Sequence, residues 1–67
     1  MGAIEQKVLG ALLFLANGKK EVTAKRKEII HEMGYLTDGG AISFALRLLE
    51  MNNYIARPSK NQYIILV

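Results

Sequence analysis

The sequence predicts a single α+β domain, with three helices followed by a C-terminal β-hairpin. Three observations lead to this fold class. Three segments carry apolar residues at helical spacing, and each segment is followed by a glycine or asparagine that can stop a helix. Residues 54–67 are rich in β-branched and aromatic residues around a central turn signal. The length of 67 residues leaves room for one domain only, so we expect it to span residues 1–67.

Composition excludes several kinds of site. The chain is 51% hydrophobic and 22% charged, which is too apolar for a disordered tail. It has no cysteine and one histidine, so disulfides, thiolate zinc sites and multi-histidine metal sites are excluded. No carboxylate pair, nucleophile–base pair or phosphate-binding glycine loop has a convincing spacing. We therefore expect no enzymatic activity, no catalytic residue, no metal and no cofactor.

The first helix is expected at residues 3–16. Ile4, Val8, Leu12 and Leu15 recur along one helical face, and a second apolar stripe runs beside it. A helix that is apolar almost all round is buried by more than one neighbour. Gly18 follows as a stop signal.

The second helix is expected at residues 24–33, with Thr23 as its N-cap and Val22 in a very short strand before it. Three consecutive cations, Lys25, Arg26 and Lys27, then fall in its first turn. Cations there oppose the helix dipole, and this placement is easier to explain if they bind phosphates. The alternative is a solvated patch that costs little.

The third helix is expected at residues 38–52, after a tight turn, with Thr37 or Asp38 as its cap. Ile42, Leu46 and Leu49 form its core face, and the glycines at positions 39 and 40 weaken its first turn. The hairpin follows at residues 54–67. Its strands are expected at residues 54–57 and 62–67, and its turn at residues 58–61.

Two helices joined by a short glycine-containing turn form a helix-turn-helix, and a following hairpin makes it a winged helix. The segment Gly40–Glu50, followed by Asn53, Tyr54, Ile55 and Arg57, resembles the recognition helix and wing entry of winged-helix transcription regulators. It is most similar to multiple-antibiotic-resistance and arsenic-repressor types, and to small regulators of archaea and their viruses. Asn53 stands where such families usually have glycine. Phe44 and Leu48 stand where DNA-reading members commonly have basic or polar residues.

This resemblance implies a transcription regulator that binds double-stranded DNA. The third helix would enter the major groove by its N-terminal end, with Thr37, Ser43 and Arg47 as base contacts. An arginine fork suits guanine, so Arg47 is the strongest of these candidates. Phosphate contacts would come from the first turn of the second helix and from the wing. These residues are Lys25, Arg26, Lys27, Arg57 and Lys60.

The apolar residues exceed what one small core can enclose, so we expect a homodimer. Its interface candidates are Leu9, Leu13, Phe44 and Leu48. An alternative function uses Phe44 and Leu48 as anchors of a winged-helix protein–protein interaction module. No stretch approaches the about 20 apolar residues of a membrane span. The start of the chain also lacks the net positive charge of a signal peptide, so we expect a cytoplasmic protein without a membrane partner.

Overall fold

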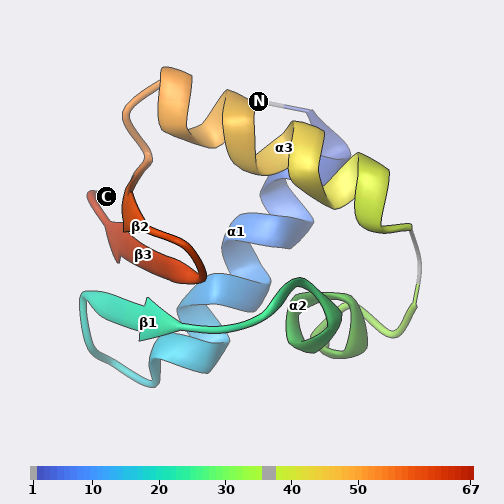
Figure 1. Cartoon of the computed structure of the whole chain (residues 1–67), viewed down its shortest axis with the longest axis horizontal. Coiled ribbons are helices and arrows are strands. Elements are labelled where there is room, and N and C mark those ends of the chain that lie inside the picture. The colour runs from blue at the N-terminus through green and yellow to red at the C-terminus, as the bar shows by residue number, and fades with distance from the viewer. Residues whose placement is uncertain (1, 36–37) are drawn as a thin grey trace.

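A computed structural model of the chain describes residues 2–35 and 38–67. Its elements, in chain order, are α1 (Ala3–Ala16), β1 (Glu21–Thr23), α2 (Arg26–Glu32), α3 (Gly39–Met51), β2 (Ile55–Ser59) and β3 (Gln62–Ile65) (Figure 1). The domain is therefore α+β, with three helices and a three-stranded sheet, and its element order is the expected one. The bounds of α1 match the predicted helix. The predicted third helix matches α3 with its two capping residues.

The sheet is antiparallel, with strand order β1-β3-β2. Its middle strand is therefore the last in the sequence, and it pairs with segments on both sides. Val22 lies opposite Tyr63 in one pairing, and Ile55 lies opposite Ile65 in the other. This pairing brings β1, which follows the first helix, against the C-terminal hairpin.

The core lies where α1, α3 and the sheet meet. Helix α1 lies behind α3 in Figure 1 and runs on toward β1, and it packs against α2 as well. The prediction that this helix has more than one neighbour is thus confirmed. The largest fully buried side chains are Val8, Leu12, Ile29, Ile42, Leu46, Leu49 and Ile55. Ile30 packs against this core but is only partly buried.

The predicted start of the second helix, at Ala24 with Thr23 as its cap, is wrong. Helix α2 begins at Arg26, and Lys25 is the N-cap residue. Thr23 instead belongs to β1 and lies opposite Gln62. The N–H of Ala24 donates to the carbonyl of Asn61 at 2.9 Å, and its side chain is buried. Pairing with the hairpin keeps this backbone extended, which outweighs the local capping preference of threonine. The helix also ends one residue earlier than predicted, with Met33 as its C-cap.

The predicted turn at residues 58–61 is too long, because Pro58 and Ser59 belong to β2. The register shifts between Ala56 and Ser59, so the ladder has an irregularity at Arg57 and Pro58. Proline donates no hydrogen bond, and it is tolerated here because β2 is an edge strand with a bulge. The turn contracts to Lys60 and Asn61, and Asn61 has the positive φ of 63° that asparagine tolerates. At the other ends, Tyr54 precedes β2, and Leu66 and Val67 follow β3.

We predict that Leu12→Ala lowers the free energy of unfolding by about 2–5 kcal/mol, since Leu12 is fully buried between α1 and its neighbours. A domain of this size has a total stability of roughly 3–10 kcal/mol, so this variant should lose a large part of its stability. Urea denaturation followed by circular dichroism measures the loss.

The matched control is Leu13→Ala, one residue along the same helix, where the leucine is 46% exposed. Its loss should stay below about 1 kcal/mol. Equal losses for the two variants would contradict the burial of α1 described above.

Candidate nucleic-acid interface

The hairpin turn lies directly beside the start of α2. The hydrogen bond from the Ala24 N–H to the Asn61 carbonyl joins the two segments at 2.9 Å. Lys60 precedes Asn61, and Lys25 follows Ala24. Two exposed lysines that are 35 positions apart in the sequence therefore sit on adjacent backbone segments.

The start of α3 lies against the same region through Arg26. A Cβ atom built on Gly39 would come within 3.3 Å of the Arg26 Cδ, so the arginine stem passes closely over this glycine. With a side chain at position 39, the arginine stem would have to give by a few tenths of an ångström. The small size of Gly39 thus suits the close approach between the first residues of α2 and α3. We call the region of Lys25, Arg26, Gly39 and Lys60 the basic junction.

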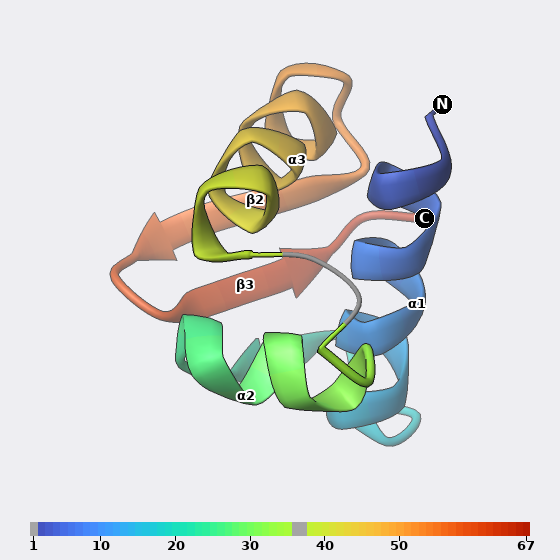
Figure 2. The same cartoon turned by 90° about the vertical axis from the view of Figure 1, so that its right-hand side faces the viewer.

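The basic junction lies on one side of the domain. In Figure 2, the beginning of α2, the beginning of α3 and the turn between β2 and β3 all lie toward the left, while α1 lies at the right. The backbone segments that carry Lys25, Arg26 and Lys60 therefore lie on the side opposite the first helix. Lys25, Arg26 and Lys60, from two distant segments, lie on neighbouring backbone and place three positive charges in one region, which suits an anionic ligand.

The first turn of α3 is held by Asp38. Its Oδ1 accepts a hydrogen bond of 2.8 Å from the Ala41 N–H, as an N-cap residue does. Of the two capping residues we expected, Asp38 is therefore the one seen. Thr37, predicted as a base contact, lies outside the described residues. The capped helix then presents Gly40, Phe44, Arg47 and Met51 along one exposed stripe.

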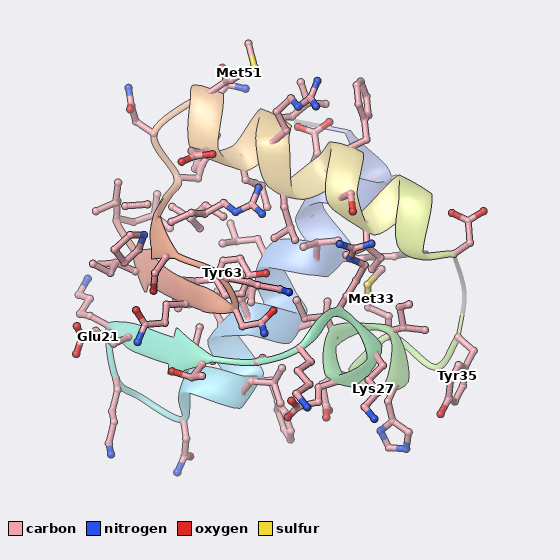
Figure 3. All side chains as sticks on the ribbon, viewed as in Figure 1. Glu21, Lys27, Met33, Tyr35, Met51 and Tyr63 are labelled. Atoms are coloured by element: carbon pink, nitrogen blue, oxygen red, sulfur yellow. The ribbon has the colours of Figure 1, made fainter. Side chains whose placement is uncertain are left out.

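The outer face of α3 is mixed in chemistry. Arg47 is exposed and forms no ion pair within residues 2–35 and 38–67. Ser43 is half-buried beside it, and Phe44 is 60% exposed. Met51 protrudes at the end of the helix (Figure 3). This face therefore offers one free guanidinium among apolar side chains.

Arg57 is engaged within the domain. Its Nη1 lies 4.0 Å from the Glu50 Oε1, which is the one ion pair of the described residues. Its Cζ lies 5.8 Å from the centre of the Tyr63 ring, on the strand opposite the bulge. Sequence reasoning named Arg57 as a phosphate contact and missed both partners, because they depend on the register of the hairpin. The side chain bridges the end of α3 to the sheet.

Lys27 lies apart from the other predicted phosphate contacts. It lines an open hollow with Leu15, His31 and Tyr35, formed by α2 and the end of α1. Figure 3 shows Lys27 below α2, on the side away from α3. Successive helix residues point about 100° apart, so Arg26 and Lys27 face different surfaces. The structure thus brings together Lys25, Arg26 and Lys60, but not Lys27.

The predicted interface leucines and Phe44 do not form one patch. Leu9 is half-buried against the core, and Leu13 is 46% exposed on α1. Phe44 and Leu48 line a separate groove of about 320 Å³ between α3 and the first residues of α1. The exposed face of α1 and the groove beside Phe44 are therefore two separate candidate contact surfaces.

Sequence reasoning did not predict the packing roles of three residues in the site. Ala24 and Asn61 make the bond that sets the junction, and Gly39 allows its close packing. The sequence offered only weak local signals for them: Ala24 is a small residue after a short strand, Gly39 follows a helix cap, and Asn61 lies in a turn. Their partners are distant in sequence, so the contacts themselves carried no local signal.

Within residues 2–35 and 38–67, no three His, Asp or Glu side chains gather to hold a metal ion. None of the helices in these ranges is long and apolar enough to cross a bilayer. No family model, curated protein or solved structure matches the chain. The site must therefore be interpreted from its own geometry.

We predict that Asp38→Ala lowers the free energy of unfolding by about 1 kcal/mol, because the Ala41 N–H loses its acceptor. Asp38→Asn keeps a capping oxygen and should lose only a few tenths of a kcal/mol. Thermal unfolding of the two variants measures the difference. If alanine and asparagine are equally destabilising, the cap does not hold α3.

Proposed function

We propose that this protein is a winged-helix DNA-binding protein, a transcription regulator that binds duplex DNA as a homodimer. In this proposal α2 and α3 form the helix-turn-helix, and β2 and β3 form the wing. The observation that carries the proposal is the basic junction. It combines the start of a helix-turn-helix with the turn of a hairpin, the two parts from which a winged helix contacts DNA backbone.

Charge supports a polyanionic ligand. The chain carries nine Lys and Arg against six Asp and Glu, and three of these cations meet at one junction. Their acidic neighbours are already engaged: the Glu28 Oε1 accepts from the Lys25 N–H at 2.9 Å, and Asp38 caps α3. Phosphates neutralise such cations and release counterions, which gives salt-sensitive affinity. Lys25, Arg26 and Lys60 are therefore our proposed phosphate contacts.

Base reading in this proposal depends on Arg47. It is exposed on the outer stripe of α3, and its guanidinium has no acidic partner among the described residues. Such a group can bond O6 and N7 of one guanine together. Ser43 is a secondary candidate one turn earlier. With few polar groups on this face, we expect modest discrimination between sequences.

A second function is favoured by the exposed aromatic residue. Phe44 is 60% exposed beside a groove that continues onto Leu48 and the start of α1. Exposed apolar surface of this kind marks protein contacts. A winged-helix protein–protein interaction module would use Phe44 as its anchor. It would show no salt-sensitive binding of DNA, so a salt titration separates the two functions.

We predict that Lys60→Ala weakens binding to specific and random duplexes alike. The slope of log affinity against log salt should become about one unit less steep, because one phosphate contact is lost. Fluorescence anisotropy at two or more salt concentrations measures both quantities. Lys19→Ala is the matched control: this exposed lysine follows α1, away from the hairpin turn.

If Lys19→Ala and Lys60→Ala reduce affinity equally, binding is diffuse and the basic junction is not the site. If the wild-type protein binds duplex DNA without salt dependence, the proposed function fails and the protein-contact function is favoured.

We predict that Arg47→Ala weakens binding to a duplex selected from a random pool by about 1–3 kcal/mol, with little effect on random duplex. Arg47→Lys keeps the charge but not the planar fork, so it should lose most of the same discrimination. Competition anisotropy with selected and random duplexes measures the ratio. Equal losses on both duplexes would show that Arg47 contacts backbone only.

A further inference from the structure

The exposed positions of α1 are spaced symmetrically about Gly10. The exposed residues of the helix and its C-cap are Ala3, Gln6, Lys7, Gly10, Leu13, Phe14 and Asn17. These positions lie three, four and seven residues to either side of Gly10, so they form one continuous helical stripe. Lys7 is the only charged residue among them. A half-exposed leucine and a phenylalanine that is 70% exposed dominate its C-terminal half.

Gly10 has no role inside the protomer that would explain it. A Cβ atom built there meets nothing within 4 Å, and its φ is not positive. Glycine in the middle of a helix nevertheless disfavours the helix relative to alanine. Close approach of another backbone is a common reason for glycine in such a position. Among residues 2–35 and 38–67, no backbone approaches it.

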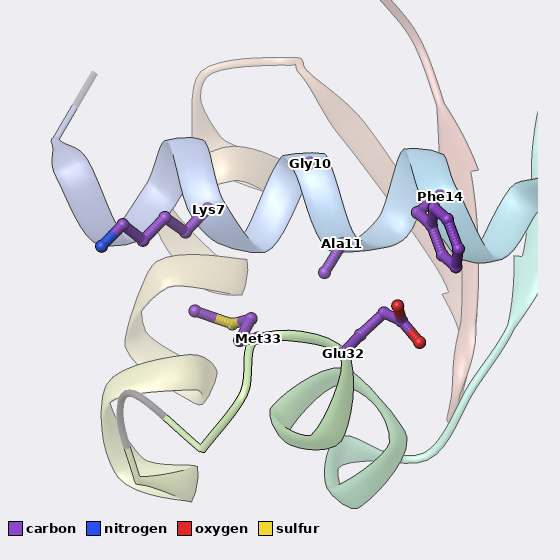
Figure 4. Close-up of a pocket in the computed structure, with 6 residues that line it drawn as sticks. All are labelled: Lys7, Gly10, Ala11, Phe14, Glu32 and Met33. Carbon is purple, nitrogen blue, oxygen red and sulfur yellow. The ribbon is translucent and has the colours of Figure 1, made fainter.

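A groove of about 360 Å³ runs beside this glycine, between α1 and the end of α2. Figure 4 shows Lys7 at one end of the groove, with Phe14 and Glu32 at the other and Met33 between them, across from α1. Lys7 and Glu32 are exposed, and neither forms an ion pair within the described part of the chain. The groove is therefore apolar in its centre and carries opposite charges at its ends.

We propose that a second copy of this chain occupies the groove, with the two α1 helices antiparallel and crossing at Gly10. A two-fold axis at Gly10 places a residue that precedes Gly10 by a given number of positions opposite the partner's residue that follows Gly10 by the same number. Lys7 therefore lies opposite the partner's Leu13. Lys7 then reaches the end of the groove that holds the partner's Glu32. The symmetric pair, Glu32 with the partner's Lys7, forms at the same time.

The same axis brings Phe14 over the other end of the partner's groove. There it covers the aliphatic stem of the partner's Lys7 and the thioether of the partner's Met33, both apolar surfaces of this groove. Opposite charges at the two ends make the groove self-complementary, which is what a two-fold interface requires. The groove beside Phe44 and Leu48 lacks this property, because Glu5 is the only charged residue among the described residues that line it.

This proposal rests on the homodimer of the proposed function and assigns its surface, which differs from the predicted interface at Leu9 and Phe44. It shares no residue with the basic junction. Self-association without DNA and DNA binding by dilute protein can therefore be measured separately, and the failure of one does not imply the failure of the other.

Sedimentation equilibrium of the full chain, from low micromolar to near-millimolar concentration, tests the charge pair. Lys7→Glu and Glu32→Lys should each raise the dimer dissociation constant about tenfold or more, because symmetry doubles the effect of each reversal. The double variant with both changes should return to within about threefold of wild type. Lys19→Glu changes the net charge equally outside the groove, and it should have no comparable effect.

Three results would overturn the proposal. They are a wild-type monomer at every concentration, a dimer that is indifferent to both reversals, and single variants that the double change does not rescue. Loss of DNA affinity in an otherwise normal dimer would instead contradict the proposed function alone.

A cross-link tests the crossing point directly. The chain has no cysteine, so Gly10→Cys introduces a single thiol. Open space around Gly10 accommodates the side chain. Two such residues form a disulfide only if their Cα atoms lie within about 7 Å, as at a helix crossing. Mild oxidation should give mostly covalent dimer for Gly10→Cys and little for Lys19→Cys. Equal cross-linking of the two variants would contradict a crossing at Gly10.

Discussion

The pairing of β1 with β3 is the contact on which the arrangement of this domain depends. Only three residues of β1, from Glu21 to Thr23, take part in this pairing. They nevertheless set the position of the backbone that precedes and follows the strand. On one side the Lys20 carbonyl accepts from the Ile65 N–H at 2.7 Å, and on the other the Ala24 N–H donates to Asn61. The start of α2 is therefore set by the hairpin and not by its own helical propensity. Helix α3 contacts α2 through Gly39 and Arg26, and it also packs on α1, so both helices hold it in place.

This dependence explains which parts of the fold could be predicted from the sequence. Helix α1 is a long apolar segment with residues such as Val8 and Leu12 at helical spacing, and Asn17 ends it in the left-handed conformation with φ of 52°, so local signals suffice. The same holds for α3, with an aspartate cap and regular leucines. The start of α2 could not be found in this way, because threonine caps helices well in isolation and nothing local shows that Thr23 pairs with Gln62. Pro58 was predicted to lie in the turn for the same reason. A proline is accepted within β2 only because β2 lies at the edge of the sheet, and nothing local in the sequence shows that position.

In the candidate site, too, local features could be predicted from the sequence, and features that depend on distant pairings could not. The concentration of cations at residues 25–27 was visible in the sequence, but their separation by about 100° per residue sends Lys27 to a different surface from Arg26. Arg57 looked like a free wing cation until the hairpin register placed it between Glu50 and Tyr63. What the sequence predicts well is the kind of residue available. What it predicts poorly is which of them face the same way, because that depends on pairings between distant strands.

The position of β3 in the middle of the sheet also affects how the protein is made. Its partners are β1 near the beginning of the chain and β2 just before it, so the sheet closes only when residues 62–65 are free to pair. During synthesis β1 leaves the ribosome well before β3, so Val22 has no strand to pair with until residues 62–65 have also emerged. Until then the lysines on either side of the hairpin bond are not yet neighbours. The charged surface is thus assembled only after β3 has been synthesised.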